Sequence, residues 1–235
     1  GIYMAFCEDP LVEHLRINNV DQMGILIRSC IGGATQHNQI VFDAQDEAGS
    51  TSDSLDIQYG IAVGMATQGH VTQYNHIEGG RHSIDQAGTG IADHYGVVRD
   101  WTIHGNICKG SWLAAISTHQ SVGRLTITAN KLLDCQVGIN VRYCDEVIVS
   151  DNIVDAFQYG MQFYNAVYDL NVHHNKIRAG FRTIIINGPI SINDLAGPIL
   201  FNHNECYGGD FGFYVSALTL GTNSHIEAND NYFEG

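Results

Sequence analysis

The sequence predicts an all-β fold, a right-handed parallel β-helix (solenoid) with loop insertions, formed by residues 1–235 as one domain. Three observations predict it: a repeat of about 22 residues, an Asn at the same place in each copy, and short alternating apolar runs between the Asn positions. A stacked coil is expected when each repeat cannot bury its apolar side alone. Leucine-rich repeats would need regular Leu and helical segments, and propeller blades need a period of about 40 residues.

The repeat is clearest in two consecutive segments, LTITANKLLDCQVGINVRY and VIVSDNIVDAFQYGMQFYN. In each, an apolar residue follows the Asn by two places, and a Gly-plus-apolar pair follows it by eight and nine places. We expect the repeated Asn residues to stack in one turn, because Asn tolerates a left-handed backbone and its amide can bond to the next Asn. Their separations are 31, 24, 22, 23, 29 and 27 residues, and they are Asn75, Asn106, Asn130, Asn152, Asn175, Asn204 and Asn231.

Along the chain, residues 1–50 carry weaker copies, at 15–28 and 39–45. Three polar stretches, 46–59, 86–100 and 187–198, are expected to loop off the coil on one side. The chain has no capping element at either end, so we expect a fragment of a longer protein.

Composition excludes several classes of protein. The chain has 25 Asp+Glu against 11 Lys+Arg, a net charge of −14, which disfavours nucleic acid and anionic membranes as partners. The sequence has no P-loop, GxSxG, HExxH or paired CxxC motif, so nucleotide hydrolysis, α/β-hydrolase chemistry and structural zinc have no support. It also lacks an apolar run of about 18 residues and a basic-then-apolar leader, so neither a membrane-spanning helix nor a signal peptide is expected.

The six cysteines are not expected to form a disulfide framework. Cys108 and Cys206 occupy the same core position four repeats apart, ~19 Å at the spacing of stacked strands, which is too far for a disulfide. We expect buried thiols and assembly in a reducing compartment, with later delivery to a surface still possible.

Alternate residues of a strand face outward, so the outward columns follow from the apolar residue of each Gly-plus-apolar pair. The Asn106 copy is two residues longer, and placing Ile116 level with Ile139 turns Ser117 and His119 outward. The first outward column contains Asp85, Asn140, Gln162, Ile185 and Tyr214. The next contains Arg142, Tyr164, Asn187 and Ser216.

Two short motifs then point to a family. GGRHSI at 79–84, followed by HGN and by AISTHQ at 115–120, resembles the Gly-Arg-His and Asp-Thr-His pair of pectate-lyase-like β-helices in bacteriophage tailspikes and preneck appendages. The resemblance implies a homotrimeric virion-tail protein, assembled in the host cytoplasm, that binds and cleaves a bacterial surface polysaccharide. This chain has Ser117 where the Asp would stand, and Asp85 on the adjacent copy is the nearest replacement.

The site residues follow from the columns and the motifs, because aromatic rings stack on sugars and Arg binds carboxylates. The catalytic candidates are Asp85, His119, Asp93 and His82. The substrate-binding candidates are Arg81, His94, Asn140, Arg142, Tyr164 and Tyr214. No cofactor or metal is expected.

Four functions stay open at this point. Hydrolysis would use Asp85 and Asp93 as the two carboxylates. Elimination at a uronate would use His119 and Arg142. Teichoic-acid phosphodiester cleavage is suggested by the three His residues at 82, 94 and 119. A non-catalytic carbohydrate-binding adhesin would use the same groove.

One further column has metal-ligand chemistry. Asp151, His174, His203 and Asp230 directly precede the Asn on four copies and could chelate a metal. A hydrogen-bonded turn ladder is the expected role of these four residues.

Overall fold

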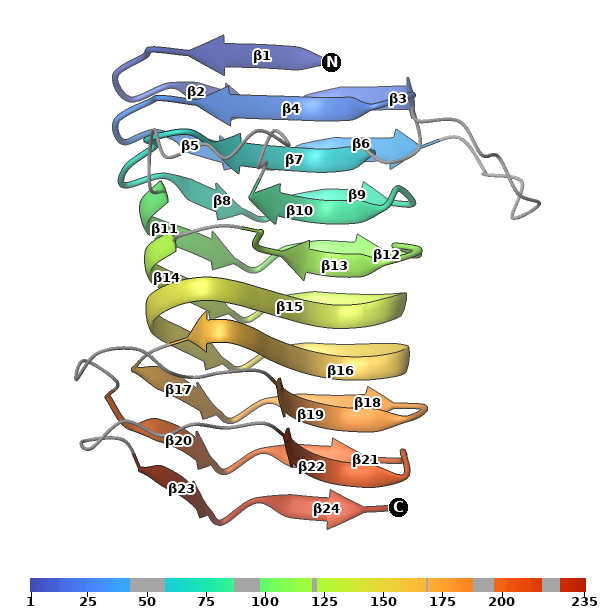
Figure 1. The fold of residues 1–235 in the computed structure, drawn as a ribbon. Coiled ribbons are helices and arrows are strands. Elements are labelled where there is room, and N and C mark those ends of the chain that lie inside the picture. The colour runs from blue at the N-terminus through green and yellow to red at the C-terminus, as the bar shows by residue number, and fades with distance from the viewer. Residues whose placement is uncertain (43–57, 87–97, 120–121, 168, 188–196, 217–224) are drawn as a thin grey trace.

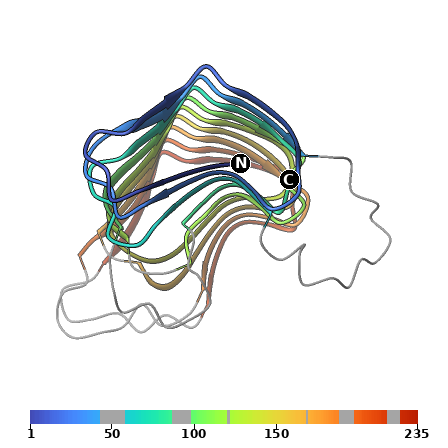
Figure 2. The same cartoon turned by 90° about the horizontal axis from the view of Figure 1, so that it is seen from above.

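The computed structural model describes residues 1–42, 58–86, 98–119, 122–167, 169–187, 197–216 and 225–235. These residues form a right-handed parallel β-helix, so the predicted fold class is confirmed (Figure 1). Seen from above, successive coils lie over one another (Figure 2). No helix within the described ranges is long and apolar enough to cross a membrane.

Each turn of the helix, here called a rung, contributes strands to three parallel sheets. The first sheet contains β1 (Ile2–Ala5), β4 (Met23–Arg28), β7 (Tyr59–Gly64), β10 (His82–Gln86), β13 (Ala114–Ser117), β19 (Arg182–Asn187) and β22 (Phe211–Ser216). The second contains β2 (Leu11–Glu13), β5 (Ala34–Gln36), β8 (Val71–Gln73), β11 (Val98–His104), β14 (Val122–Thr128), β17 (Leu170–His173), β20 (Ile199–Asn202) and β23 (Ile226–Asn229).

The third sheet contains β3 (Arg16–Val20), β6 (Gln39–Phe42), β9 (His76–Glu78), β12 (Ile107–Lys109), β18 (Lys176–Ala179), β21 (Glu205–Tyr207) and β24 (Tyr232–Glu234). Two long strands continue from the third sheet into the first, β15 (Lys131–Ser150) and β16 (Ile153–Val167). β15 also supplies the strand of the second sheet that pairs with β14 and β17.

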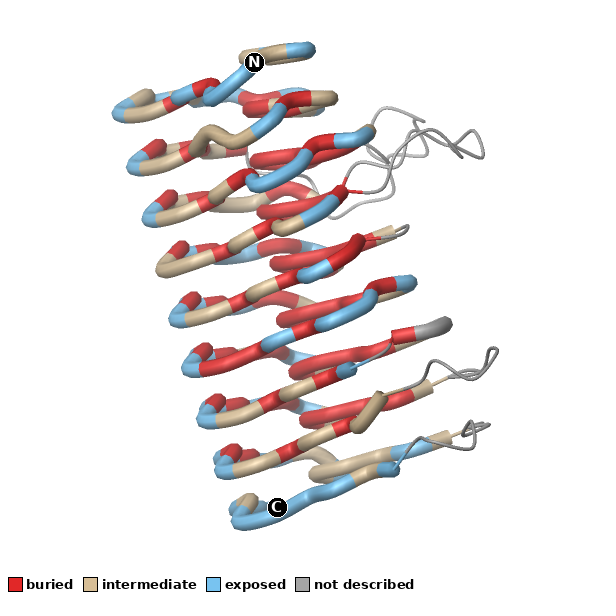
Figure 3. Tube along the Cα trace, turned by 90° about the vertical axis from the view of Figure 1, so that its left-hand side faces the viewer, coloured by how far each residue is buried: buried red, intermediate tan, exposed pale blue. Residues whose placement is uncertain are grey.

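The core is the interior of the coil, and buried residues recur along its rungs up to Cys206, whereas residues 225–235 at the C-terminal end include no buried residue (Figure 3). Cys108 and Cys206 belong to one inward column four rungs apart, as predicted, and both are buried and free. Burial raises the pKa of the Cys108 thiol to about 12, so the thiol stays protonated. The column contains Ile77, Cys108, Leu132, Val154, Ile177 and Cys206.

The predicted Asn stack is present, with one more member and a different backbone geometry. From Asn75 onward each side-chain oxygen accepts two bonds, from the backbone N–H and from the side-chain amide of the Asn one rung before, at 2.9–3.1 Å. The left-handed residue is the one before the Asn, for example Ala129 (φ 57°) before Asn130, so the prediction that the Asn itself is left-handed was wrong. The left-handed bend of the turn thus comes one residue before the Asn, and the Asn side chains from Asn38 to Asn204 are buried. The ladder contains Asn38, Asn75, Asn106, Asn130, Asn152, Asn175, Asn204 and Asn231.

Residues 1–42 form rungs, as the weaker copies in this part of the sequence indicated, since β1, β4 and β7 pair in register and Asn38 joins the ladder. One boundary prediction needs correction. The predicted loop stretches lie mostly outside the described residues, but their edges at Tyr59, Gln86, Val98–Asp100 and Asn187 belong to strands.

Candidate functional site

The GGRH segment turns the chain into β10. Gly79 and Gly80 both have a φ of 79°, and a Cβ on Gly80 would meet the ring of Phe42 at 2.8 Å, so only Gly fits both the backbone and the space. Arg81 then lies with its guanidinium carbon 5.9 Å from the ring centre of Trp112. The next residue, His82, begins the strand.

His82 and Asp85 share the outward face because the two residues between them both face inward. Ser83 contacts the buried Ser111 hydroxyl at 2.6 Å, and Ile84 belongs to the core. The next rung repeats this arrangement, with both residues at 115 and 116 in the core. A regular strand would place residues three apart on opposite faces. Here the doubled inward position brings an imidazole and a carboxylate together.

The predicted alignment of the longer rung is confirmed, because Ile116 pairs with Ile139. As a result Ser117 lies level with Asp85 of β10. His119 follows two residues later, and its backbone N–H donates to Gln86 Oε1 at 3.0 Å. This bond holds the His119 ring over the neighbouring rung.

The centre of the site is the contact between Asp85 and His119. His119 Nε2 lies 3.0 Å from Asp85 Oδ1 and 3.4 Å from Ser117 Oγ. The Asp85 side chain is fully buried, whereas 26% of the His119 side chain is exposed. Neither Asp85 oxygen completes a hydrogen bond with another residue. The pair is therefore a buried carboxylate beside an accessible imidazole, with Asp85 level with Ser117 on the adjacent rung.

His82 adds a second imidazole. Its Nδ1 lies 2.9 Å from the carbonyl oxygen of Ala114, so the proton is assigned to Nδ1 and Nε2 keeps a free lone pair. Nε2 is buried without a hydrogen-bond partner. Burial lowers the His82 pKa to about 4, although Asp85 opposes the shift. The ring is consequently neutral near neutral pH, and its centre lies 5.4 Å from that of His119.

These three residues form a cluster with metal-ligand chemistry. One donor atom each from His82, Asp85 and His119 lie within 4.8 Å of one another, and no other group of three His, Cys, Asp or Glu in the described ranges does so. The turn column that the sequence suggested has the expected hydrogen-bonded ladder in its backbone, because the N–H groups of Asp151, His174 and His203 each donate to a carbonyl oxygen of the next rung at 3.1–3.3 Å. In addition, the His174 and His203 rings stack at 5.0 Å, and His203 lies 3.6 Å from the exposed Asp230 carboxylate.

Below the cluster, the outward columns continue as predicted. Asn140, Gln162, Ile185 and Tyr214 align rung by rung, and so do Arg142, Tyr164, Asn187 and Ser216. The guanidinium of Arg142 lies 5.6 Å from the ring centre of Tyr164, and its Nε donates to Asn140 Oδ1 at 3.4 Å. Asp93 and His94 lie outside the described residues.

Sequence reasoning missed a further outward column and one residue in it. In each Gly-plus-apolar pair both residues face inward, so the residue directly before the pair faces outward. These outward residues form a column that includes Tyr59, His82, Tyr159, Arg182 and Phe211. Arg182 lies with its guanidinium carbon 3.8 Å from the ring centre of Tyr214. The signal was present in the sequence, as the position directly before each pair.

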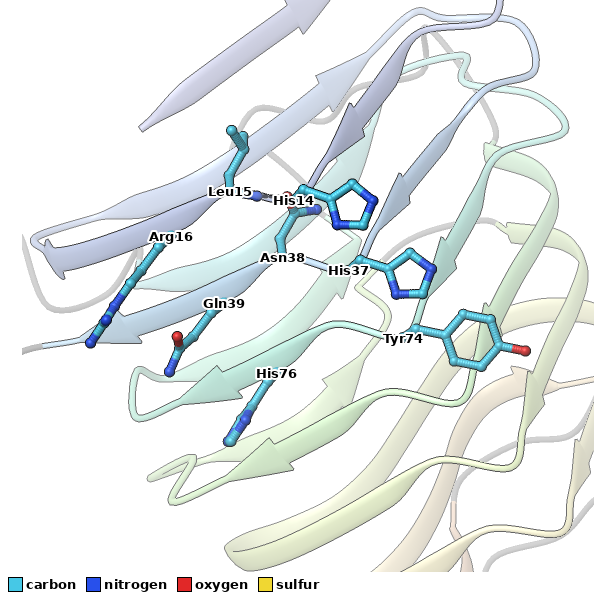
Figure 4. A pocket seen from close by; sticks show the side chains of 8 residues that line it. All are labelled: His14, Leu15, Arg16, His37, Asn38, Gln39, Tyr74 and His76. Carbon is cyan, nitrogen blue, oxygen red and sulfur yellow. Dashed lines mark hydrogen bonds between the residues drawn. The ribbon is translucent and has the colours of Figure 1, made fainter.

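A separate hollow lies at the turn between the second and third sheets near the N-terminus (Figure 4). The rings of His14, His37 and Tyr74 stack along it with centres 5.3 Å apart. Arg16 and His76 also line it. No carboxylate is among the described residues that line it, although Glu78 Oε1 lies 3.0 Å from His76 Nε2.

The fold and the cluster define a parallel β-helix protein with ionisable side chains gathered on its first sheet. Residues 1–187 match the NosD family, described as periplasmic copper-binding protein, and the chain belongs to this family. No curated protein matches the sequence.

Solved structures share the fold at low sequence identity. PfbA, a surface adhesin of Streptococcus pneumoniae, is similar with a TM-score of 0.68 and 10% identity, covering 98% of this chain and 62% of PfbA. Endopolygalacturonase I from Stereum purpureum, complexed with two galacturonate, has a TM-score of 0.62 and 13% identity, and the match covers 96% of this chain and 69% of that protein. The periplasmic alginate epimerase AlgG has a TM-score of 0.57 and 12% identity, and the match covers 90% of this chain and 47% of AlgG. This chain thus spans about half to two thirds of these proteins.

Proposed function

We propose that this protein binds an acidic polysaccharide along its first sheet and cleaves it by elimination at a uronate. The observation that carries the proposal is the buried Asp85 carboxylate 3.0 Å from Nε2 of the accessible His119. When Nε2 carries the ring proton, a carboxylate at this distance can orient the imidazole and make the other nitrogen a better base. The His119 side chain is 26% exposed, so a bound sugar can reach it.

In this reaction the imidazole of His119 takes the C5 proton of a uronate. The electron pair left behind forms the C4=C5 double bond, the C4–O4 bond to the next sugar breaks, and the departing oxygen takes a proton from water. We favour elimination because His119 can serve as the base and Arg142, one rung away, can neutralise the uronate carboxylate. Hydrolysis would use Asp93 as the second carboxylate, which lies outside the described residues. Phosphodiester cleavage by a third histidine at 94 would involve a residue outside the described ranges.

The rungs below the cluster supply the groups that an acidic polymer needs. Arg142 offers a planar guanidinium to a carboxylate, and Tyr164 offers a ring to a sugar face. Arg142 lies on the rung next to that of Ser117 and Tyr164 lies one rung further, so one polymer can touch the base and the guanidinium together.

The test is a panel of uronate polymers, namely polygalacturonate, alginate and hyaluronan, with product size and ultraviolet absorbance of the unsaturated uronate as readouts. The wild-type protein should cleave at least one of them. His119→Ala should slow turnover by about 10²–10⁴-fold, the usual contribution of a general base, with binding still measurable. Asp85→Asn should act in the same direction.

The matched control is the exposed pair on the turn, His203 and Asp230, which is also an imidazole beside a carboxylate. His203→Ala and Asp230→Asn should leave turnover unchanged. Full activity in both site variants would remove the assignment. Binding of a polymer without cleavage would replace the enzyme with an adhesin.

Two further properties of the protein stay predictions. The first is that the chain is a tailspike segment on a virion tail, and the second is that the full-length protein is a homotrimer. Sedimentation of the full-length chain as a monomer at micromolar concentration would contradict the second. The family description names the periplasm, and this supports an extracytoplasmic polysaccharide as the proposed ligand.

A second candidate function is copper binding, because the family description names that metal. The cluster fits a metal ion: His82 Nε2 is buried without a partner, its Nδ1–H is held by a carbonyl, and both Asp85 oxygens lack hydrogen bonds. His82, Asp85 and His119 would hold the ion through two nitrogens and a carboxylate, ligands that suit copper and zinc. When bound, copper would supply positive charge beside the buried carboxylate.

The two candidates use the same residues, so metal content separates them. Calorimetric titration with Cu²⁺ or Zn²⁺ should give one site that His82→Ala weakens by about 10–100-fold, the usual range for loss of a group that holds or orients a metal, whereas His203→Ala leaves it unchanged. If protein stripped with EDTA binds no added metal and still cleaves, the base mechanism stands alone. If His82→Ala keeps wild-type affinity for metal, the cluster is not the metal site.

A further inference from the structure

A second charged position lies on the first sheet, four rungs below His82 in the same outward column. The guanidinium of Arg182 lies among three aromatic rings, with its carbon 3.8 Å from the ring centre of Tyr214, 4.7 Å from that of Phe181 and 5.6 Å from that of Phe211. Four steps of strand spacing put it ~19 Å along the helix axis from the candidate catalytic cluster.

Arg182 has no anionic partner among the residues that the structure describes, although the protein has more than twice as many acidic as basic residues. Among the described residues its side chain forms no hydrogen bond or ion pair, and its Nε is buried without a partner. Asp210 lies in the adjacent turn, where its backbone N–H donates to Phe181 O at 2.8 Å, but its carboxylate does not pair with Arg182. Other arginines do pair, such as Arg178 with Asp155.

The aromatic rings fix the orientation of the guanidinium without using its hydrogen-bond donors. A ring stacked on the planar face leaves the N–H groups at the edge free for a carboxylate, which they can bind through two parallel bonds. The same rings offer apolar surface on which the face of a sugar can lie. Arg142 and Tyr164 form a similar unit nearer the cluster, and both guanidiniums lie close enough to Tyr164 to lower its pKa, against the larger effect of burial.

We propose that Arg182 and its aromatic rings form a distal subsite for the carboxylate of an acidic sugar, so that the polymer lies along the helix axis from Asp85 and His119 to Arg182. This inference rests on the proposed function, because it assumes that the first sheet binds an acidic polysaccharide. The distal subsite would be a second point at which the polymer is bound, so tight binding would require a polymer long enough to reach from His119 to Arg182.

The experiment measures binding and turnover of oligogalacturonates of two and six sugars, and of carboxyl-reduced hexamer, by calorimetry and by ultraviolet absorbance. The hexamer should bind the wild type at least 10-fold more tightly than the dimer or the reduced hexamer. Arg182→Gln should abolish the tighter binding of the hexamer. Arg182→Lys, which keeps the positive charge but loses the two parallel N–H donors of the guanidinium, should retain part of it. Arg178→Gln is the matched control and should change nothing.

The outcomes separate the two proposals. Loss of the length gain in Arg182→Gln with unchanged dimer turnover supports the subsite and the function together. An equal length gain in the wild type and in Arg182→Gln overturns the subsite, whatever the turnover. Hexamer binding that needs Arg182, without turnover of any oligomer, keeps the subsite and removes the proposed elimination. Failure of the wild type to bind the acidic hexamer more tightly than the reduced one overturns the subsite.

Discussion

At the scale of single residues, the Asn ladder joins one rung to the next. The side chain of Asn130 donates to the carbonyl oxygen of Ile103 and to Asn152 Oδ1, both at 3.0 Å, and accepts from Asn106. All three Asn side chains are buried, so removing one leaves several polar groups without partners. The ladder is thus the polar counterpart of the apolar core.

Asn130→Ala is therefore expected to lower the free energy of unfolding by about 3–5 kcal/mol, since each orphaned buried group costs about 1–3 kcal/mol. Urea unfolding followed by circular dichroism measures it. The control is Asn171→Ala in β17, because Asn171 forms no side-chain hydrogen bond within the described part of the chain, and its loss should cost less than about 0.5 kcal/mol. Equal losses for both variants would contradict a structural ladder.

Two buried histidines make stability depend on pH. Burial lowers the pKa of both His70 and His82 to about 4, against an ordinary value of 6.5. Between these values the unfolded chain binds more protons than the folded one, so stability is complete above pH 6.5 and is lost as the pH falls towards 4. The limit is about 3 kcal/mol for each histidine.

His70→Gln should accordingly flatten this dependence. At pH 7 the variant is less stable, because it disrupts the contacts of the ring with Thr35 Oγ1 at 3.1 Å and with Gly32 O at 3.3 Å. At pH 4.5 the difference from the wild type should shrink, because protonation no longer destabilises the variant at this position. Urea unfolding at both pH values checks this, and a constant difference would show that His70 is not neutral in the folded protein.

At the scale of strands, two glycines in the same rungs have opposite roles. A Cβ on Gly138 would lie 2.3 Å from Val154 Cγ1 and 2.5 Å from the Gly160 carbonyl oxygen, so the backbone of β15 touches the next rung there. A Cβ on Gly123 in β14 would make only ordinary contacts, at 3.7 Å or more. The first glycine is required by space and the second is not.

Gly138→Ala should consequently destabilise the protein by about 1–3 kcal/mol through overpacking, whereas Gly123→Ala should be neutral or slightly stabilising. Thermal unfolding of the two variants side by side gives the comparison. A neutral Gly138→Ala would mean that β15 and β16 can move apart at no cost.

How far the strands could be predicted depends on local regularity. The fixed offsets from each Asn predicted the fold and the inward column of Cys108, whereas the alignment of Ile116 with Ile139 was an assumption made for a copy two residues longer than the others. The juxtaposition of His82 with Asp85 could not be predicted, because a strict two-residue alternation puts them on opposite faces, and only the doubled inward position reverses this. Arg182 was missed for the same reason. Asn38 was missed because a 37-residue gap separates it from Asn75.

At the scale of the whole molecule, the net charge of −14 opposes the proposed ligand. Long-range repulsion between an acidic protein and a polyuronate slows their encounter, and salt screens it over about 10 Å at 0.1 M. The association rate should therefore rise with ionic strength, the reverse of ordinary electrostatic steering. Stopped-flow binding of polygalacturonate measures this, and a rate that falls with salt would mean that the local guanidiniums dominate the encounter.

The decisive measurement is a crystal structure of the Asp85→Asn variant with a bound oligogalacturonate. We expect a chain of sugars along the first sheet, with a uronate C5 beside the His119 ring and carboxylates at Arg142 and Arg182. Sugars bound instead across the His14, His37 and Tyr74 hollow, or on the second or third sheet, would contradict both the proposed site and the direction of the polymer.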